Sequence, residues 1–229
     1  MRIAGLDFLR GGAVLLVVFR HAGQNNLISE IGWVGVDLFF VLSGFLISGI
    51  IFKEYAHSQK INLTRFLIRR GFKIYPAFYF FIGVTILSYY ITTGNFYSSL
   101  QVMNEVFYLQ SYREGIWFHT WSLAVEEHFY FGFAIFIFVC LKTKLIEKKW
   151  FIPFFLVLLL LFVIVIRYGV VAENINKTFF SFTQTHLRLD GILIGVIISW
   201  FYHFTGFYTY FLSRRYVFLA CAFVLISPL

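Results

Sequence analysis

The feature that most limits how this chain can fold is a series of seven apolar stretches separated by short polar segments. Each stretch is long enough, or nearly so, to cross a bilayer as a helix of about 20 residues. Hydrophobic residues make up 60% of the chain and charged residues only 13%, whereas a soluble domain has about 25% charged residues. The sequence therefore predicts an all-α polytopic membrane protein. The predicted spans cover residues 5–22, 32–52, 74–93, 121–140, 150–168, 189–204 and 216–229.

The cations between these stretches predict the orientation of the chain. If each stretch crosses the membrane, thirteen of these cations lie in the terminus and loops on one side, and three lie in the loops on the other side. Because loops rich in Lys and Arg stay in the cytoplasm, we expect the N-terminus and the 53–73 connection inside, in a cell (inner) membrane protein. The net charge of +8 reflects these loops and does not indicate nucleic-acid binding, since the chain has no polar basic domain. The thirteen cations are Arg2, Lys53, Lys60, Arg65, Arg69, Arg70, Lys73, Lys142, Lys144, Lys148, Lys149, Arg214 and Arg215.

The two ends of the chain predict one continuous membrane domain. The first stretch has no small-residue cleavage site, so we expect it to remain as a span in the mature protein. The last stretch ends at Pro228-Leu229 with no basic or aromatic flank after it. We therefore expect residues 1–229 to form a single integral-membrane domain that is incomplete at its C-terminus. No metal site and no permanently bound cofactor are expected.

Ionisable residues mark the first stretch as more than an anchor. Arg10 lies within the run, and His21 lies at its far end. Eleven residues make three turns plus about 20°, so both side chains fall on one helix face, roughly 16 Å apart. Asp7 lies one turn before Arg10 and can pair with it. Charges inside a span usually face a bundle interior or a water-filled cavity, which favours a functional pair over incidental charges on a signal anchor.

A second polar group opens the fourth stretch. His119, Ser122 and Glu126 are spaced i, i+3 and i+7, so one helix face presents all three side chains. Glu126 then lies about two turns below His119. Two interpretations stay open, because structural ion pairs and functional carboxylates both occur at such positions. Glu126 is either a functional carboxylate or a structural one that neutralises Arg10 or Arg188.

Depth in the membrane sorts the candidate residues into two groups. Arg10, Arg69, Arg70 and Lys73 lie toward the cytoplasm, where cations suit phosphate groups and arginine binds them bidentately. A histidine with a carboxylate, as expected on the outer side, can remove a proton from a hydroxyl. The pattern favours a phosphate-bearing donor inside and a hydroxyl acceptor outside, although orientation alone explains most of the 53–73 cations. The outer group consists of His21, Asp37, His119, Glu126, Arg188 and Asp190.

Five motifs follow one another between residue 5 and about residue 200. They are Leu6 to Gly11 with His21, Gly35 to Ile47, Arg69-Arg70 with Ile74 to Pro76, Trp121 to Tyr130, and Arg188 to Gly191 with Gly195. Each is weak alone, but together and in this order they resemble the acyltransferase type 3 family of membrane-bound O-acyltransferases. The resemblance implies a protein of typically about ten spans, of which this chain reaches seven. It also implies acyl transfer from cytoplasmic acyl-CoA to a hydroxyl, often on an extracytoplasmic glycan such as an exported polysaccharide.

The resemblance and the residue chemistry together suggest roles. His21 would act as general base or transient acyl acceptor, with Arg10 as its electrostatic partner. Glu126 would orient the imidazole or bind the acceptor. Asp37 is a pore-lining or structural group. The donor phosphates of acyl-CoA would be held by Arg69, Arg70 and Lys73, although Lys73 stands where the family usually has a second arginine and lacks its bidentate fork.

Two other classes of function remain as alternatives. The same buried charges could line the permeation path of a transporter or channel, although the sequence shows no inverted repeat with broken helices. A non-catalytic membrane subunit is the third possibility.

Overall fold

The structure is a computed structural model that describes residues 4–21, 27–173 and 183–206. Every regular element in these ranges is a helix, which confirms the all-α prediction. The seventh predicted stretch, residues 216–229, lies outside the described residues. The α-helices are α1 (Ala4–His21), α2 (Leu27–Ser58), α3 (Leu63–Thr93), α4 (Ser99–Val106), α5 (Trp121–Lys142), α6 (Phe151–Glu173), α8 (Thr185–Arg188) and α9 (Asp190–Phe204). Two short 3-10 helices, η1 (Phe118–Thr120) and η2 (Leu145–Glu147), precede α5 and α6.

Among the described residues, four helices are long and apolar enough to cross a membrane. They correspond to the second to fifth predicted stretches, and they make this chain a membrane protein. The first and sixth stretches form α1, of 18 residues, and the shorter apolar helix α9, of 15 residues. The polar-aromatic segment between α3 and η1 contains the surface helix α4, which is closed by a capping box between Ser98 and Gln101.

The third predicted stretch, residues 74–93, forms the later part of a longer helix. Helix α3 begins at Leu63, eleven residues before that stretch, where the Asn62 side chain accepts a hydrogen bond from the Arg65 backbone N–H at 2.9 Å. Such a cap satisfies one of the free N–H groups of the first turn. Pro76 lies inside α3. The basic segment 53–73 is therefore mostly helical, and its second half forms the first turns of α3.

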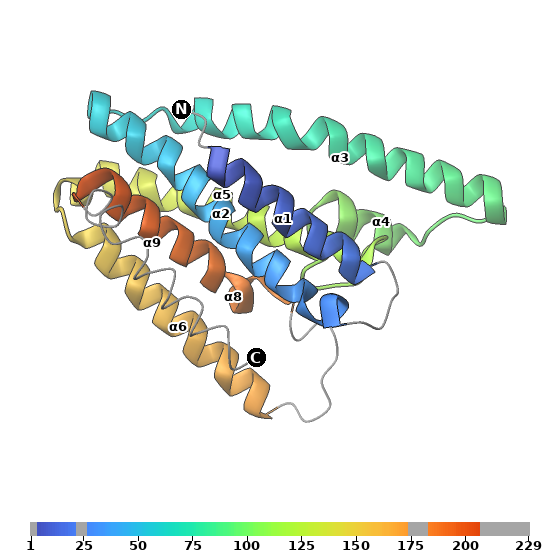
Figure 1. Ribbon diagram of the computed structural model, residues 1–229. Helices are drawn as coiled ribbons and strands as arrows, with labels where there is room; N and C mark the ends of the chain where they lie inside the picture. Colours follow the sequence, from blue (N-terminus) through green and yellow to red (C-terminus); the bar gives the residue numbers. More distant parts are fainter. Residues whose placement is uncertain (1–3, 22–26, 174–182, 207–229) are drawn as a thin grey trace.

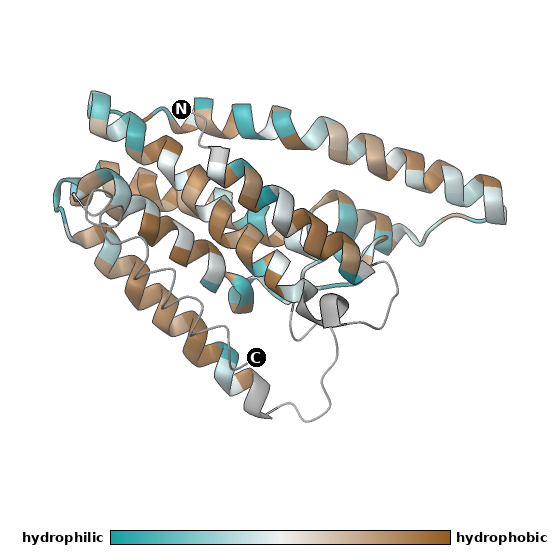
Figure 2. Ribbon diagram, in the orientation of Figure 1, coloured by the Kyte–Doolittle hydropathy of each residue, from teal (hydrophilic) through white to brown (hydrophobic). Residues whose placement is uncertain are grey.

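Helix α2 lies at the centre of the fold (Figure 1), with α1 packed along one flank and α9 along the other. Helix α6 lies on the far side of α9, and α3 runs along the opposite edge of the molecule. The largest core cluster joins α2, α5, α6 and α9, and it includes Phe40, Ile51, Val125, Leu156 and Ile192. Figure 2 shows apolar residues along most of the helices α2, α5, α6 and α9, and polar ones concentrated toward helix ends.

Glycines allow α2 and α9 to approach unusually closely. A Cβ atom placed on Gly44 would lie 2.1 Å from the Ile192 carbonyl oxygen, and one on Gly195 would lie 2.1 Å from the Val41 carbonyl oxygen. Both distances are well inside van der Waals contact. Small residues are the usual means by which membrane helices bring their backbones together. This crossing holds the beginning of α9 against the middle of α2.

We predict that Gly195→Ala lowers the thermal stability of the full-length protein in detergent, by about 1–3 kcal/mol, because the helices must move apart. Gly83→Ala in α3 is the matched control, since a Cβ atom there meets no other atom within 4 Å. That substitution should stabilise the protein slightly through helix propensity. Equal melting temperatures for the Gly195→Ala variant and the wild type would contradict the close crossing.

Candidate active site

A cationic cavity of about 910 Å³ opens between the C-terminal half of α2, the first turns of α3 and the end of α9. This volume is in the range of small-molecule sites, about 300–1,000 Å³. Five cations line it against a single carboxylate, Glu54, so the cavity has a strongly positive potential. The cations are Lys53, Arg65, Arg69, Arg70 and Lys73. The predicted donor-binding residues Arg69, Arg70 and Lys73 thus share one cavity.

Helix geometry explains how α3 presents these charges. Arg65, Arg69 and Lys73 are spaced four residues apart, so their side chains form one row along the helix. Arg69 and Lys73 are exposed, whereas Arg70, one position round the helix, is partly buried. Like charges in such a row repel one another, and an anion in the cavity would relieve that repulsion. The row is therefore suited to a ligand that carries several negative charges.

Arg70 connects this cavity to a buried polar network on α5. Its guanidinium lies 4.2 Å from the centre of the Tyr130 ring and donates a hydrogen bond to the Tyr130 hydroxyl. That hydroxyl donates to the Glu126 carboxylate at 2.8 Å and lies 2.5 Å from the Ser43 hydroxyl of α2. Tyr130 is almost completely buried, and Glu126 is buried as well. One tyrosine oxygen thus joins α2, α3 and α5.

Glu126, expected on the outer side of the membrane, is linked through Tyr130 to Arg70, which was expected on the inner side. It contacts the Arg70 network through Tyr130, and Arg188 instead pairs with Asp37. His119 lies in η1, before α5, and is exposed, whereas Glu126 is buried. Ser122 donates only a long hydrogen bond, of 3.4 Å, to the His119 carbonyl. The structure therefore does not bring the side chains of His119 and Glu126 into one environment.

Several residues of this network were given no role by the sequence analysis. Glu127 is buried and accepts a hydrogen bond from the Tyr75 hydroxyl of α3 at 3.0 Å. Tyr130 and Ser43 lie in motifs noted above, but nothing in the sequence assigned them a contact. Only Tyr130 carried a usable signal, because it lies one turn after Glu126 on the same helix face. The contacts of Tyr130 with Ser43 of α2 and with Arg70 of α3 join residues that are 87 and 60 positions apart in the sequence.

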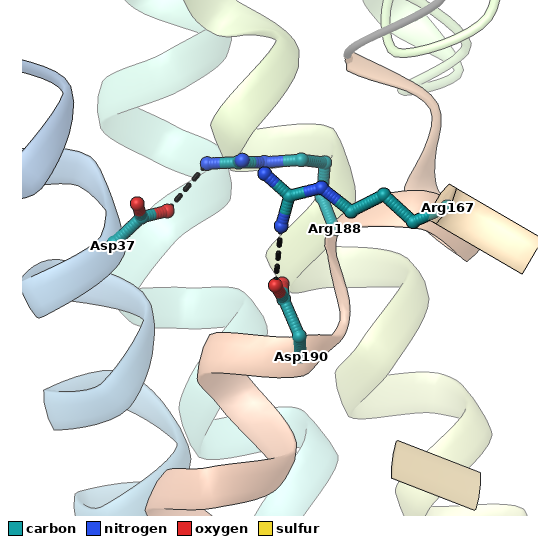
Figure 3. Close-up of polar contacts among 4 residues, drawn as sticks. All are labelled: Asp37, Arg167, Arg188 and Asp190. Carbon is teal, nitrogen blue, oxygen red and sulfur yellow. Dashed lines mark hydrogen bonds and ion pairs between the residues drawn. The ribbon is translucent and has the colours of Figure 1, made fainter. Parts of the chain in front are cut away.

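A second charged cluster lies where α8 meets α2 (Figure 3). Arg188 donates to Asp37 at 2.5 Å, and Arg167 of α6 donates to Asp190 at the start of α9, also at 2.5 Å. The Arg188 side chain is only 6% exposed and lies over the rings of Trp33, Phe40 and Trp121, with 5.5–5.9 Å from guanidinium carbon to ring centre. Cation–π contacts of this kind stabilise a desolvated cation. The cluster thus anchors α8 to α2.

The predicted site residues of the first helix lie on α1, which packs against α2. Arg10 is partly buried, with its guanidinium 5.9 Å from the centre of the Phe39 ring on α2. Asp7 is exposed on the same helix. His21 is the last residue of α1, and its side chain lies outside the described part of the structure. The predicted pairing of His21 with Glu126 stays a prediction.

Comparison with known proteins identifies the class. A membrane helix bundle with a cationic cavity leading to a buried carboxylate fits a membrane enzyme that handles an anionic substrate. A family model described as "Acyltransferase domain", of the acyltransferase 3 group, matches residues 3–228. The chain belongs to this family, as the five motifs indicated.

Named relatives point in the same direction. O-acetyltransferase OatA of Staphylococcus aureus strain NCTC 8325 is 30% identical over 219 residues, which cover 86% of this chain and 34% of the relative. A protein of S. aureus strain COL, named an O-acetyltransferase by prediction, is 32% identical over 215 residues, with 86% and 34% covered. The chain spans about a third of the length of these relatives. No solved structure matches it.

The two ion pairs of the second cluster should differ in their effect on stability. We predict that Asp37→Asn destabilises the protein by about 1.5–3 kcal/mol, because it removes the charged partner of the buried Arg188. Asp190→Asn should cost less than about 1 kcal/mol, because the Arg167 side chain is 38% exposed and water can replace the lost partner. Thermal unfolding of both variants in detergent measures the difference. Equal losses would show that Arg188 does not depend on Asp37.

Proposed function

We propose that this chain is the membrane part of an O-acyltransferase. It would move an acyl group, most simply acetyl, from cytoplasmic acyl-CoA to a hydroxyl of an extracytoplasmic glycan such as a cell-surface or exported polysaccharide. The observation that carries the proposal is the cationic cavity joined through Arg70 to the buried Tyr130–Glu126 pair. Family membership and the names of the relatives support acyl transfer over the transporter and subunit alternatives.

The cavity suits the phosphates of acyl-CoA. Several cations on one wall can neutralise several phosphate charges, and Arg69 and Arg70 offer planar donor groups for bidentate contacts. The opposite wall includes apolar and aromatic residues such as Phe45, Ile47 and Tyr202, against which the uncharged parts of the donor can pack. A donor bound in this way would hold its phosphates against the cationic wall, with its acyl end extending past Arg70 toward Tyr130 and Glu126.

The proposed orientation follows from the distribution of cations. Arg65, Arg69, Arg70 and Lys73 belong to the thirteen cations expected on one side of the membrane, against three on the other. With the cation-rich side in the cytoplasm, the cationic cavity opens to the compartment that holds acyl-CoA. The N-terminus of α5 and the 94–120 connection then face the outside, in a cell (inner) membrane.

His21 is the proposed group that removes the proton from the acceptor hydroxyl, or that carries the acyl group transiently. With the proposed orientation it lies at the outer end of α1, where an extracytoplasmic hydroxyl can reach it. Arg10 lies on the same helix face and would act as an electrostatic partner along the acyl path. Glu126 would orient or pair with groups at the reacting centre.

We predict that Arg69→Gln raises the KM for acetyl-CoA about ten- to a hundred-fold, because one charge-assisted contact of about 1.5–3 kcal/mol is lost. Lys148→Gln is the matched control: it removes one cation from the same predicted side of the membrane, but Lys148 does not line the cavity. Steady-state kinetics and direct CoA binding to the purified full-length protein measure both variants. Equal effects of the two substitutions would show that the cations set orientation only.

We predict that His21→Ala abolishes measurable acyl transfer to the glycan in cells that carry the full-length gene, at normal protein level. General-base assistance contributes typically 10²–10⁴-fold, so its loss should bring transfer below detection. His21→Gln tests the same role with a smaller change in volume. Wild-type acylation of the glycan by a normally expressed His21→Ala protein would remove this role and favour the transporter or subunit alternatives.

A further inference from the structure

Two carboxylates and one guanidinium group meet in the interior between α3 and α5. Glu126 is 5% exposed and Glu127 is 3% exposed. Arg70 contacts Glu126 through the Tyr130 hydroxyl, and it lies within electrostatic range of both carboxylates. We call Arg70, Glu126 and Glu127 the carboxylate cluster.

The charges of this cluster do not balance when all three groups are ionised. One cation against two anions leaves a net charge of −1 in a buried site, and an uncompensated buried charge is strongly disfavoured. The other titratable groups that face the cluster are Tyr75 from α3, Tyr108 from the loop after α4 and Tyr130 from α5, and tyrosines are neutral near pH 7. One proton shared by the two carboxylates restores neutrality. The cluster is therefore built to hold a proton.

Free polar atoms extend from the cluster in two directions. One oxygen of Glu127 and the Tyr108 hydroxyl are buried without a hydrogen-bond partner among the described residues. Burial raises the pKa of Tyr108, and the nearby Glu127 carboxylate raises it further, so this hydroxyl stays neutral and would relay a proton by accepting one as it donates its own. On the other side, Arg70 lines the cationic cavity. Polar groups thus run from the loop after α4 to the cavity.

The proposed reaction requires a proton to move between the two sides of the membrane. In RC(O)–S–CoA + HO–R′ → RC(O)–O–R′ + HS–CoA, the C–S bond breaks and a C–O bond forms. The acceptor hydroxyl loses its proton outside, and the CoA thiolate gains one inside. Without a proton path, the acyl group leaves a thiolate inside and a released proton outside. Its transfer is therefore equivalent to moving one positive charge outward. A proton that moves inward for each acyl group that moves outward makes the transfer electroneutral.

We propose that the carboxylate cluster carries this proton: Glu127 receives it from the Tyr108 side, the Glu126 carboxylate and the Tyr130 hydroxyl pass it on, and Arg70, which keeps its own protons, holds that hydroxyl beside the cavity. The proposal rests on the acyl transfer proposed above, because only transfer between the two sides separates the two proton steps. Glu127 is a proton carrier in this scheme and holds neither donor nor acceptor.

The test uses the full-length protein in proteoliposomes, with radiolabelled acetyl-CoA on one side and alkali-deacylated fragments of the cell's own glycan on the other. Potassium gradients with valinomycin set the membrane potential. We expect wild-type transfer to be insensitive to potential. Glu127→Gln keeps the side-chain volume and an oxygen that can accept from Tyr75, but it cannot titrate. It should slow transfer at least a hundred-fold and leave CoA binding unchanged.

The residual transfer by Glu127→Gln should slow further when the acceptor side is made positive, by up to about 50-fold for 100 mV. Glu105→Gln is the control for loss of a buried carboxylate beside Tyr108: Glu105 is completely buried, accepts a hydrogen bond from the Ile116 N–H and lies within electrostatic range of Tyr108, but it is not on the route from Tyr108 through Glu127 to Glu126 and Tyr130. Its transfer should stay insensitive to potential. Tyr75→Phe, which removes only the hydrogen bond to Glu127, provides a second variant if Glu127→Gln fails to fold, and should slow transfer in the same potential-sensitive way.

The outcomes separate the two proposals. Wild-type transfer that depends on potential, or variants of the cluster that transfer at the wild-type rate or without potential dependence, would overturn the proton path and leave acyl transfer intact. Absence of transfer by the wild-type protein would overturn the proposed function, and the proton path with it.

Discussion

A guanidinium group buried among apolar helices has to meet an oxygen or an aromatic ring, because an unpaired charge there costs several kcal/mol. Two arginines impose this condition at different places in the bundle. Arg188 requires Asp37 and the surrounding rings, and so fixes α8 against α2. Arg70 requires Tyr130, and so fixes the cationic start of α3 against α5. These two contacts determine where the cationic cavity and the Asp37–Arg188 pair lie.

Close backbone packing makes the first of these contacts possible. The glycines at the crossing of α2 and α9 bring the start of α9 against the middle of α2, and Arg188 lies two residues before that start. The same α2 segment supplies Ser43 to the Tyr130 hydroxyl, next to Gly44 at the crossing. A loosened crossing would therefore disturb both the Asp37–Arg188 pair and the network that leads to Glu126. Packing without any charge thus positions two charged sites.

The sequence predicted the helical class, the family and the shared location of Arg69, Arg70 and Lys73, because each depends on local pattern or on motifs along the chain. It gave the third stretch as residues 74–93 and did not include the first eleven residues of α3, which a cap at Asn62 begins. It placed Glu126 in a different group from the inner cations. The position of a residue along its own helix does not show which side chains of neighbouring helices contact it. The long Arg70 side chain reaches from α3 to the Tyr130 hydroxyl on α5. This contact follows only from the packing of α3 on α5.

The order of charges along this route favours transfer of an acyl group over passage of a whole anion. Cations line the cavity as far as Arg70, and beyond Arg70 lie the Glu126 and Glu127 carboxylates, of which one stays ionised when the cluster holds its proton. A ligand with several phosphates is attracted as far as Arg70 and is then opposed by negative charge and by the buried Tyr130. A neutral acyl group meets no such barrier. The same electrostatics that would bind acyl-CoA would therefore keep CoA on the cavity side while its acyl group is released to the other.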